Sequence, residues 1–198
     1  MDTQVPIVEA VSKISQIDAR RALKDVSVDL VTAPGINLDE WVKLYANLIK
    51  RHAIKGIRAF SRDSFAKQIA VPNTHFFRAW YNGRLVAGNL YIIQKDVAYG
   101  HLLALTDDGY RLGASHAIMW IAYQHLSKLV RWINLGGSTG SNKGELTGLD
   151  KFKMGWTNEI RKSYFCARIL DKDKYDVLTS KQTTIIPGWF PAYRMDDF

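Results

Sequence analysis

Residues 74–105, THFFRAWY-NG-RLVAGNLYIIQ-KD-VAYGHLLAL, decide the fold of this chain. Three β-rich runs follow one another in it, Thr74–Tyr81, Arg84–Gln94 and Val97–Leu105. Asn82-Gly83 is a strong two-residue hairpin turn because both residues tolerate positive φ, and Lys95-Asp96 is a weaker one. The stretch therefore predicts an antiparallel meander of three strands.

The segment before the meander combines helical and β-rich patterns. Apolar residues at helical spacing predict a helix over Ile7–Lys24, whose buried face would consist of Ile7, Val11, Ile14 and Ile17. Val26–Thr32 is a short β-rich run that ends before Pro34-Gly35. We expect this run to add a strand to the meander.

Two more helices are predicted between that run and the meander. An apolar stripe at helical spacing covers Leu38–Ile49, and Asn37 can cap its start, with Glu40 placed to complete a reciprocal cap. A shorter helix begins at Ser61, where the Phe60–Phe65 pair is spaced as a hydrophobic staple across the cap.

The pattern after the meander completes the fold class. A helix is predicted over Ala114–Leu129, a strand over Arg131–Leu135, and one or two further strands over Glu159–Leu170. The order indicates an α/β (α+β) protein whose mixed central sheet contains an antiparallel meander and carries flanking helices. We expect one domain over residues 1–198, with an N-terminal helical segment at 1–25 and a C-terminal extension at 171–198.

Composition limits the partners and the compartment. A formal net charge of +8 favours anionic partners such as phosphorylated cofactors, nucleotide-linked substrates or RNA. Cys166 is the only cysteine, which excludes an intrachain disulfide and suits a reducing compartment; its alternating surroundings favour a packed strand residue over a nucleophile. Neither a signal peptide nor a membrane-spanning stretch is visible, so we expect a cytoplasmic protein without membrane insertion.

The strongest candidate site combines glycines with a lysine between aromatic residues. Gly136-Gly137 follows an apolar strand, and glycine lets backbone amides approach a ligand closely. Lys153 follows Phe152 and precedes Trp156 in the next block. A cation among aromatic side chains, beside backbone donors, is suited to binding an oxyanion or a phosphate. An exposed lysine after an ordinary glycine turn is the alternative.

The order of these blocks resembles the GNAT acyltransferase fold, and more closely its Fem-like branch of peptidoglycan-bridge aminoacyltransferases and their relatives. The matching stretches are Arg20–Lys24 before a strand, Trp80–Gly88, Leu135-Gly136-Gly137, and Gly148-Leu149 with Phe152-Lys153 and Trp156. The resemblance spans roughly positions 20 to 170.

The resemblance implies an N-acyltransferase with acyl-CoA (acetyl-CoA) or aminoacyl-tRNA as the donor. The acceptor would be a small-molecule or nucleotide-linked amine, in cell-wall or polysaccharide precursor metabolism. Two departures stand out: Fem enzymes usually have two GNAT-like halves, and the usual pyrophosphate loop is replaced here by Asp108–Ala114. An acceptor site shared with a first half would be either absent or supplied by another subunit. A homodimer is the assembly we consider.

The resemblance also suggests roles for individual residues. It implies that Lys153 holds a phosphate or stabilises a tetrahedral intermediate, with Phe152 and Trp156 packing to position it. It implies that His101 handles the proton of the amine, with Tyr99 as an alternative acid on the same face; a satisfied sheet histidine is the other interpretation.

A second group of candidates lies in the loops. Arg111 and the amides of Gly113, Ala114 and Ser115 could receive a donor phosphate at a helix start, or the loop could merely cap that helix. Glu145 is a candidate base near the lysine block, or a solvated charge. The scattered histidines and single cysteine predict no metal site.

Two functions of different classes therefore stay open. One is the N-acyltransferase. The other is a non-catalytic GNAT-like module that binds RNA or a nucleotide-linked ligand through its positive charge and aromatic residues.

Overall fold

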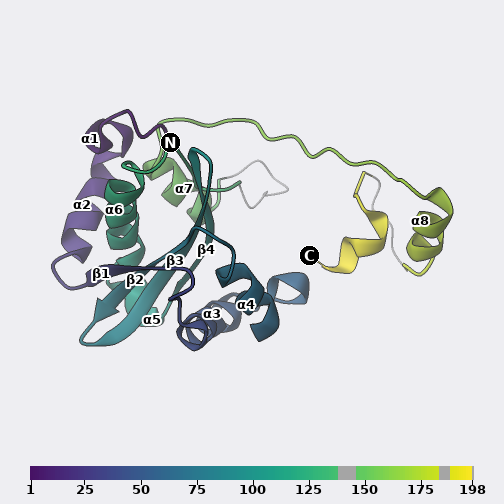
Figure 1. The fold of residues 1–198 in the computed structure, drawn as a ribbon, viewed down its shortest axis with the longest axis horizontal. Helices are drawn as coiled ribbons and strands as arrows, with labels where there is room; N and C mark the ends of the chain where they lie inside the picture. The colour runs from purple at the N-terminus through teal and green to yellow at the C-terminus, as the bar shows by residue number, and fades with distance from the viewer. Residues whose placement is uncertain (138–145, 183–187, 198) are drawn as a thin grey trace.

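The computed structural model describes residues 1–137, 146–182 and 188–197. Its centre is a five-stranded sheet in the order β1-β2-β3-β4-β5 (Figure 1). The strands are β1 (Ser27–Thr32), β2 (Thr74–Tyr81), β3 (Arg84–Gln94), β4 (Val97–Leu105) and β5 (Trp132–Asn134). All neighbours are antiparallel except β4 and β5, which are parallel. The predicted mixed sheet with its meander is thus confirmed.

The hairpin turns explain why the meander could be predicted from the sequence. Asn82 and Gly83 have φ angles of 48° and 71°, as a two-residue turn with two left-handed positions requires. Lys95 also has a positive φ, of 54°. The observed bounds of β2, β3 and β4 coincide with the predicted ones.

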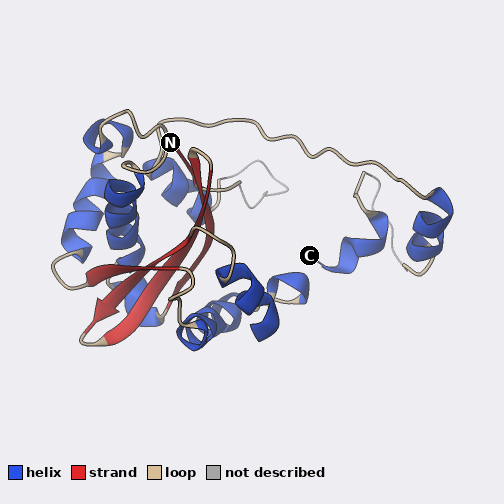
Figure 2. Cartoon of the chain, in the orientation of Figure 1, coloured by secondary structure: helices blue, strands red, loops and turns tan. Residues whose placement is uncertain are grey.

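Helices cover both faces of the sheet (Figure 2). One face carries α2 (Lys13–Ala22) and α6 (Ala114–Leu126), preceded by the single turn α1 (Ile7–Ala10). α6 is largely apolar, and its Ile118 and Leu126 are completely buried against the sheet. Because α6 connects β4 to β5, it forms the crossover that their parallel pairing requires.

The other face carries α3 (Leu38–His52) and α4 (Arg62–Ile69). Trp41 is fully buried there and makes edge contacts with Phe65 and Phe76, at ring-centroid distances of 5.9 and 5.4 Å. The predicted staple is confirmed, since the Phe60 and Phe65 rings are 5.6 Å apart across the Ser61 cap. The short helix η1 (Gly56–Arg58) joins α3 to α4.

The prediction of one helix over Ile7–Lys24 is wrong. The chain is extended at Val11 and Ser12, and the Ser12 side chain caps a new helix by accepting from the amide of Ser15. Ile14 and Ile17 are 73% and 61% exposed, whereas the face of α2 that packs on α6 is small or polar and consists of Ser15, Gln16, Ala19 and Ala22. Because α2 and α6 approach each other closely, the positions of α2 between them hold small side chains rather than large apolar ones.

The predicted reciprocal cap on α3 is half right. The Asn37 side chain accepts from the amides of Asp39 and Glu40, as expected. The Glu40 carboxylate instead accepts from Arg78 on β2 at 2.9 Å, and Arg78 also pairs with Asp29 on β1 at 2.8 Å. An ion pair between elements therefore took the place of the local cap.

The strands predicted over Glu159–Leu170 are absent. After α7 (Gly148–Gly155) the chain runs as an extended, exposed arm to α8 (Lys172–Thr179) and η2 (Ala192–Asp197) (Figure 1). Cys166 is exposed on this arm, so its prediction as a packed strand residue is wrong. The terminal elements are held together by aromatic contacts, with the Tyr175 ring stacked on Phe190 at 5.8 Å.

Candidate active site

The site is built where β4 and β5 separate. Their parallel pairing ends at Tyr99 and Asn134. On its other side, β4 pairs Gly100 with Tyr91 and Leu102 with Leu90, which leaves His101 as the extra residue of a β-bulge. A bulge bends a strand and redirects its side chains. Beyond Tyr99, β4 therefore leaves β5, and the backbone of its second half has no partner on that side among the described residues.

Lys153 lies at this point of separation. Thr147 and Asp150 form a capping box that fixes the start of α7, so that Lys153 falls in its last turn. The Lys153 Nζ donates to the carbonyl oxygen of Gly137 at 2.7 Å. A Cβ on Gly136 would lie 3.5 Å from that Nζ and 3.9 Å from the carbonyl oxygen of Gly100. The fold thus brings the glycine and lysine blocks together beside β4.

The glycine turn has a local cause. Gly136 has a φ of +78°, a conformation that residues with a Cβ rarely adopt. Its amide donates to the Asn134 side chain at 2.8 Å, an Asx-type turn that directs the chain away from β5. Asn134 was not singled out from the sequence, although an asparagine two residues before a glycine is a turn signal.

The environment of Lys153 favours contact with an anion. Desolvation by the surrounding protein lowers the pKa of Lys153, and the nearby Asp150 carboxylate opposes this effect. An ammonium has three N–H donors, of which one is used, by the bond to Gly137, within the described part of the chain. A half-buried cation with spare donors can stabilise a negative oxygen more strongly than a solvated one.

Phe152 and Trp156 hold α7 in place. Trp156 is fully buried, and the ring of Phe152 lies edge-on to His116 at 5.0 Å. His116 also contacts the Trp156 ring, at 5.8 Å, and it belongs to the first turn of α6. The two aromatic residues therefore pack α7 against α6. Nothing in the sequence context of His116 indicates this contact.

His101 and Tyr99 lie on the neighbouring part of β4. The Nε2 of His101 is 2.9 Å from the Oε1 of Gln68 on α4, and Tyr99 is 41% exposed. An amide oxygen only accepts hydrogen bonds, so neutral His101 carries its proton on Nε2 and its lone pair on Nδ1. Desolvation lowers the pKa of His101 and thus favours this neutral form.

The candidate phosphate residues lie at the start of α6. A short helix, α5 (Asp107–Arg111), precedes it, and Arg111 bonds to Asp108 at 2.9 Å. The amide of Gly113 donates to the carbonyl of Tyr110 at 3.1 Å, and Gly113 itself has a φ of +64°. No side chain caps α6 in the described structure. The amides of Ala114 and Ser115 thus belong to the first turn of a helix without a side-chain cap.

The remaining sequence predictions concern Glu145, metal binding and membrane insertion. Glu145 lies outside the described residues. Among the described residues no group of three or more His, Cys, Asp and Glu side chains could hold a metal ion. In the same part of the chain, every helix is too short or too polar to cross a membrane.

A five-stranded mixed sheet with flanking helices and a parallel β4–β5 pair fits the class of GNAT-like folds. The sequence pattern of the acetyltransferase (GNAT) domain family matches residues 16–153, which is more than half of the chain. The chain therefore belongs to the GNAT acetyltransferase family, and its reaction class is acyl transfer to an amine.

Solved structures show the same fold at low sequence identity. An aminoglycoside acetyltransferase from an uncultured soil metagenomic sample, in complex with sisomicin, is 14% identical with a TM-score of 0.56, and the match covers 75% of this chain and 98% of that one. FemX is 12% identical with a TM-score of 0.59, covering 76% of this chain and 55% of FemX.

A third structure extends the comparison. The ribosomal-protein-alanine N-acetyltransferase of Brucella melitensis biovar Abortus 2308 is 11% identical with a TM-score of 0.54, covering 73% of this chain and 99% of that one. Comparison with curated protein sequences gave no significant match.

Proposed function

We propose that this chain transfers an acyl or aminoacyl group to the amine of a small-molecule or nucleotide-linked acceptor, with Lys153 stabilising the oxyanion of the tetrahedral intermediate. The observation that carries the proposal is the Lys153 ammonium, held 2.7 Å from the Gly137 carbonyl where β4 and β5 separate. Acyl-CoA is the donor that family membership favours. An aminoacyl-tRNA is the alternative donor, supported by the fold shared with FemX and by the positive charge.

The chemistry needs positioning, one base, one acid and one oxyanion donor. The acceptor nitrogen attacks the carbonyl carbon of the donor and forms the C–N bond, while the carbonyl oxygen takes up negative charge beside Lys153. His101 Nδ1 accepts the proton that the amine loses, with Tyr99 as the nearby hydroxyl that protonates the leaving thiolate or ribose oxygen. The C–S or C–O bond then breaks.

The donor phosphates would lie at the start of α6. Its Ala114 and Ser115 amides and its helix dipole favour an anion, and Arg111 can turn toward it from the exposed pair with Asp108. Gly136 and Gly137 allow the donor close to the backbone. We also place the protein in the cytoplasm, in precursor metabolism of the cell wall or of polysaccharides; its single cysteine supports this compartment.

The test is transfer activity with a panel of donors. Acetyl-CoA and longer acyl-CoA species are assayed by release of the free thiol, and charged tRNA by loss of the aminoacyl label, each with a set of amines. With the best pair, we expect Lys153→Met to lower kcat by about 100-fold or more, the loss typical of one oxyanion donor.

Lys153→Arg is the matched control, because it keeps the charge and should retain a measurable part of the activity. Full activity of Lys153→Met would contradict the role of the lysine. Stabilisation of the protein by RNA in a salt-sensitive manner, with no response to any acyl donor, would instead favour the non-catalytic binding module.

A further inference from the structure

The arm that follows α7 is extended like a β-strand but has no partner strand among the described residues. Residues 160–170 take part in no backbone–backbone hydrogen bond among the described residues. The large apolar side chains of the arm face solvent, with exposed fractions of 79% for Ile160, 81% for Tyr164, 77% for Phe165 and 89% for Leu170. An extended, β-rich segment of this kind readily pairs with the open edge of a sheet.

One edge of the sheet is already occupied. Residues 1–3 run antiparallel beside β5, where the amide of Thr3 donates to the carbonyl of Arg131 at 2.9 Å and that of Ile133 to the carbonyl of Met1 at 3.0 Å. The start of the arm lies on this side, because the guanidinium of Arg161 is 4.6 Å from the centre of the Trp132 ring. The arm therefore does not pair with the strand nearest to it.

The other edge is open. β1 pairs only with β2, and beyond its end the amide of Ala33 donates to the carbonyl of Thr74 on that side, at 2.9 Å. Successive amides alternate in direction along a strand. The amides of Val28, Leu30 and Thr32 consequently point outward, away from β2.

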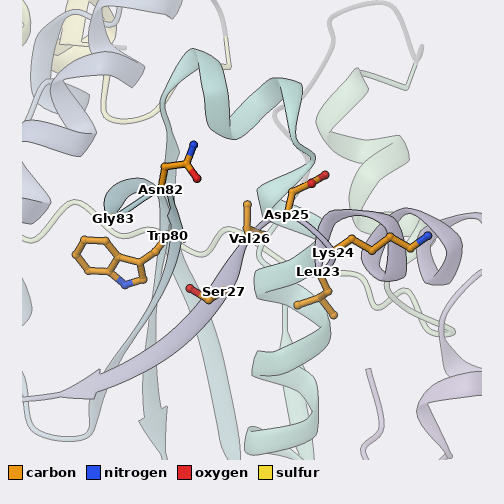
Figure 3. Close-up of a pocket in the computed structure, with 8 residues that line it drawn as sticks. All are labelled: Leu23, Lys24, Asp25, Val26, Ser27, Trp80, Asn82 and Gly83. Carbon is orange, nitrogen blue, oxygen red and sulfur yellow. The ribbon is translucent and has the colours of Figure 1, made fainter.

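A hollow lies beside the first residue of β1. It has a volume of 410 Å³ and is lined by the α2–β1 connection and the β2–β3 hairpin. Figure 3 shows Leu23, Val26 and Trp80 around it, next to Ser27. A strand added to β1 would pass this hollow, which is large enough for an aromatic side chain.

Charge makes a smaller contribution to the pairing of arm and edge. Residues 159–170 contain three basic residues and one acidic residue. On the edge, Asp29 is already paired with Arg78. Asp25 lines the hollow next to Lys24, so Asp25 is the carboxylate that a basic side chain of the arm would meet. The arm and the β1 edge of a single chain, however, start on opposite sides of the five-stranded sheet. The arm of one chain is thus better placed for the β1 edge of another.

We propose that residues 159–170 of one copy add as a sixth strand to the β1 edge of a second copy, with an aromatic side chain of the arm in the hollow beside Ser27. Reciprocal exchange of both arms closes the pair as a symmetric dimer. This interface does not depend on the transferase chemistry, so it can fail or hold independently of the proposed function.

Proline in the arm tests the interface without disturbing the domain. One of two consecutive amides must face the partner strand, so Ser163→Pro and Tyr164→Pro together remove a ladder hydrogen bond in at least one variant. Ser163→Thr and Tyr164→Phe are the matched controls, since both keep the amide and the strand preference. Analytical ultracentrifugation of the full chain should show a dimer for the wild type and both controls, and a dimer Kd raised about tenfold or more in at least one proline variant.

Cross-linking through the single cysteine tests which surfaces meet. Ser27→Cys and Thr32→Cys place a thiol on β1, and mild oxidation should join it to Cys166 of another copy, giving a covalent dimer that peptide mapping identifies. Gln94→Cys, at the far end of β3, is the control and should give no such link.

Three results would overturn the proposal. A wild type that sediments as a monomer at tens of micromolar would do so, as would two proline variants that dimerise like the controls. A link between Cys166 and the β1 cysteine within one chain would show that the arm folds back instead. A far-UV circular dichroism spectrum like that of the wild type confirms that the domain of the proline variants is intact.

Discussion

Lys153 and His101 both have a pKa lowered by desolvation, but the consequence differs for the two residues. Neutral His101 is the form that accepts a proton, so its lowered pKa extends the range in which it acts as a base. Lys153 must be charged to stabilise an oxyanion, so its lowered pKa brings the loss of that charge closer to neutral pH. The two shifts together define the pH range of the proposed reaction.

We therefore expect a bell-shaped pH profile of kcat. The acid limb should lie below the ordinary histidine pKa of about 6.5, and the alkaline limb below the ordinary lysine pKa of about 10.4. Lys153→Arg should remove the alkaline limb, because arginine stays charged throughout, and His101→Gln should remove the acid limb. Steady-state rates from pH 5 to 10 measure both, and an alkaline limb that persists in Lys153→Arg would assign it to another group.

At the scale of elements, α5 docks by direct backbone contact. The amide of Thr106 donates to the carbonyl of Val86 at 2.9 Å, and a Cβ on Gly109 would overlap that same carbonyl oxygen. The helix α5, which leads into the predicted phosphate site, can thus lie directly against β3 because Gly109 has no side chain. Gly83, by contrast, has open space around its Cβ position and only a left-handed φ of +71°.

These two glycines give a matched prediction. Gly109→Ala should lower the free energy of unfolding by about 2 kcal/mol or more, since backbone must move to relieve the overlap. Gly83→Ala should cost only about 1 kcal/mol, the strain of a left-handed alanine. Urea unfolding of both variants beside the wild type measures the difference, and equal losses would contradict the docking contact.

The meander and the crossover could be predicted because their signals are local. Asn82-Gly83 favours a turn through its own backbone preference. The apolar residues of α6 favour burial regardless of which elements pack against them. The split of α1 from α2 could not be predicted, because Ser15 and Ala19 face α6 only when both helices are in place. The arm failed as a strand for a related reason: β-rich sequence forms a strand only where an edge is available to pair with it.

At the scale of the whole molecule, histidines couple the fold to pH. Desolvation lowers the pKa of His101, His116 and His125; Asp18 partly opposes the shift at His116, and His75 and Lys128 add to it at His125. A histidine whose pKa is lower in the folded chain binds protons more readily when the chain unfolds. Protonation therefore favours unfolding.

We expect the free energy of unfolding to be at its full value above the unfolded histidine pKa, about 6.5, and to fall as the pH drops below it. Each histidine contributes a slope of up to about 1.4 kcal/mol per pH unit. His116→Phe, which keeps an aromatic ring beside Phe152 and Trp156, should reduce the slope. Denaturant unfolding at pH 7.5, 6.5 and 5.5 tests this, and stability that rises toward pH 5.5 would contradict it.

The sequence by itself determined the family, the meander and the crossover helix. Each of these depends on residues close together in the chain, whose turn, cap and periodicity preferences act locally. Only the tertiary structure decided that Lys153 reaches the Gly137 carbonyl and that His116 packs α7 against α6. It also decided that the arm does not pair with the sheet of its own chain. These depend on distant segments meeting, and burial and hydrogen bonding between such segments are settled only when the whole chain is folded.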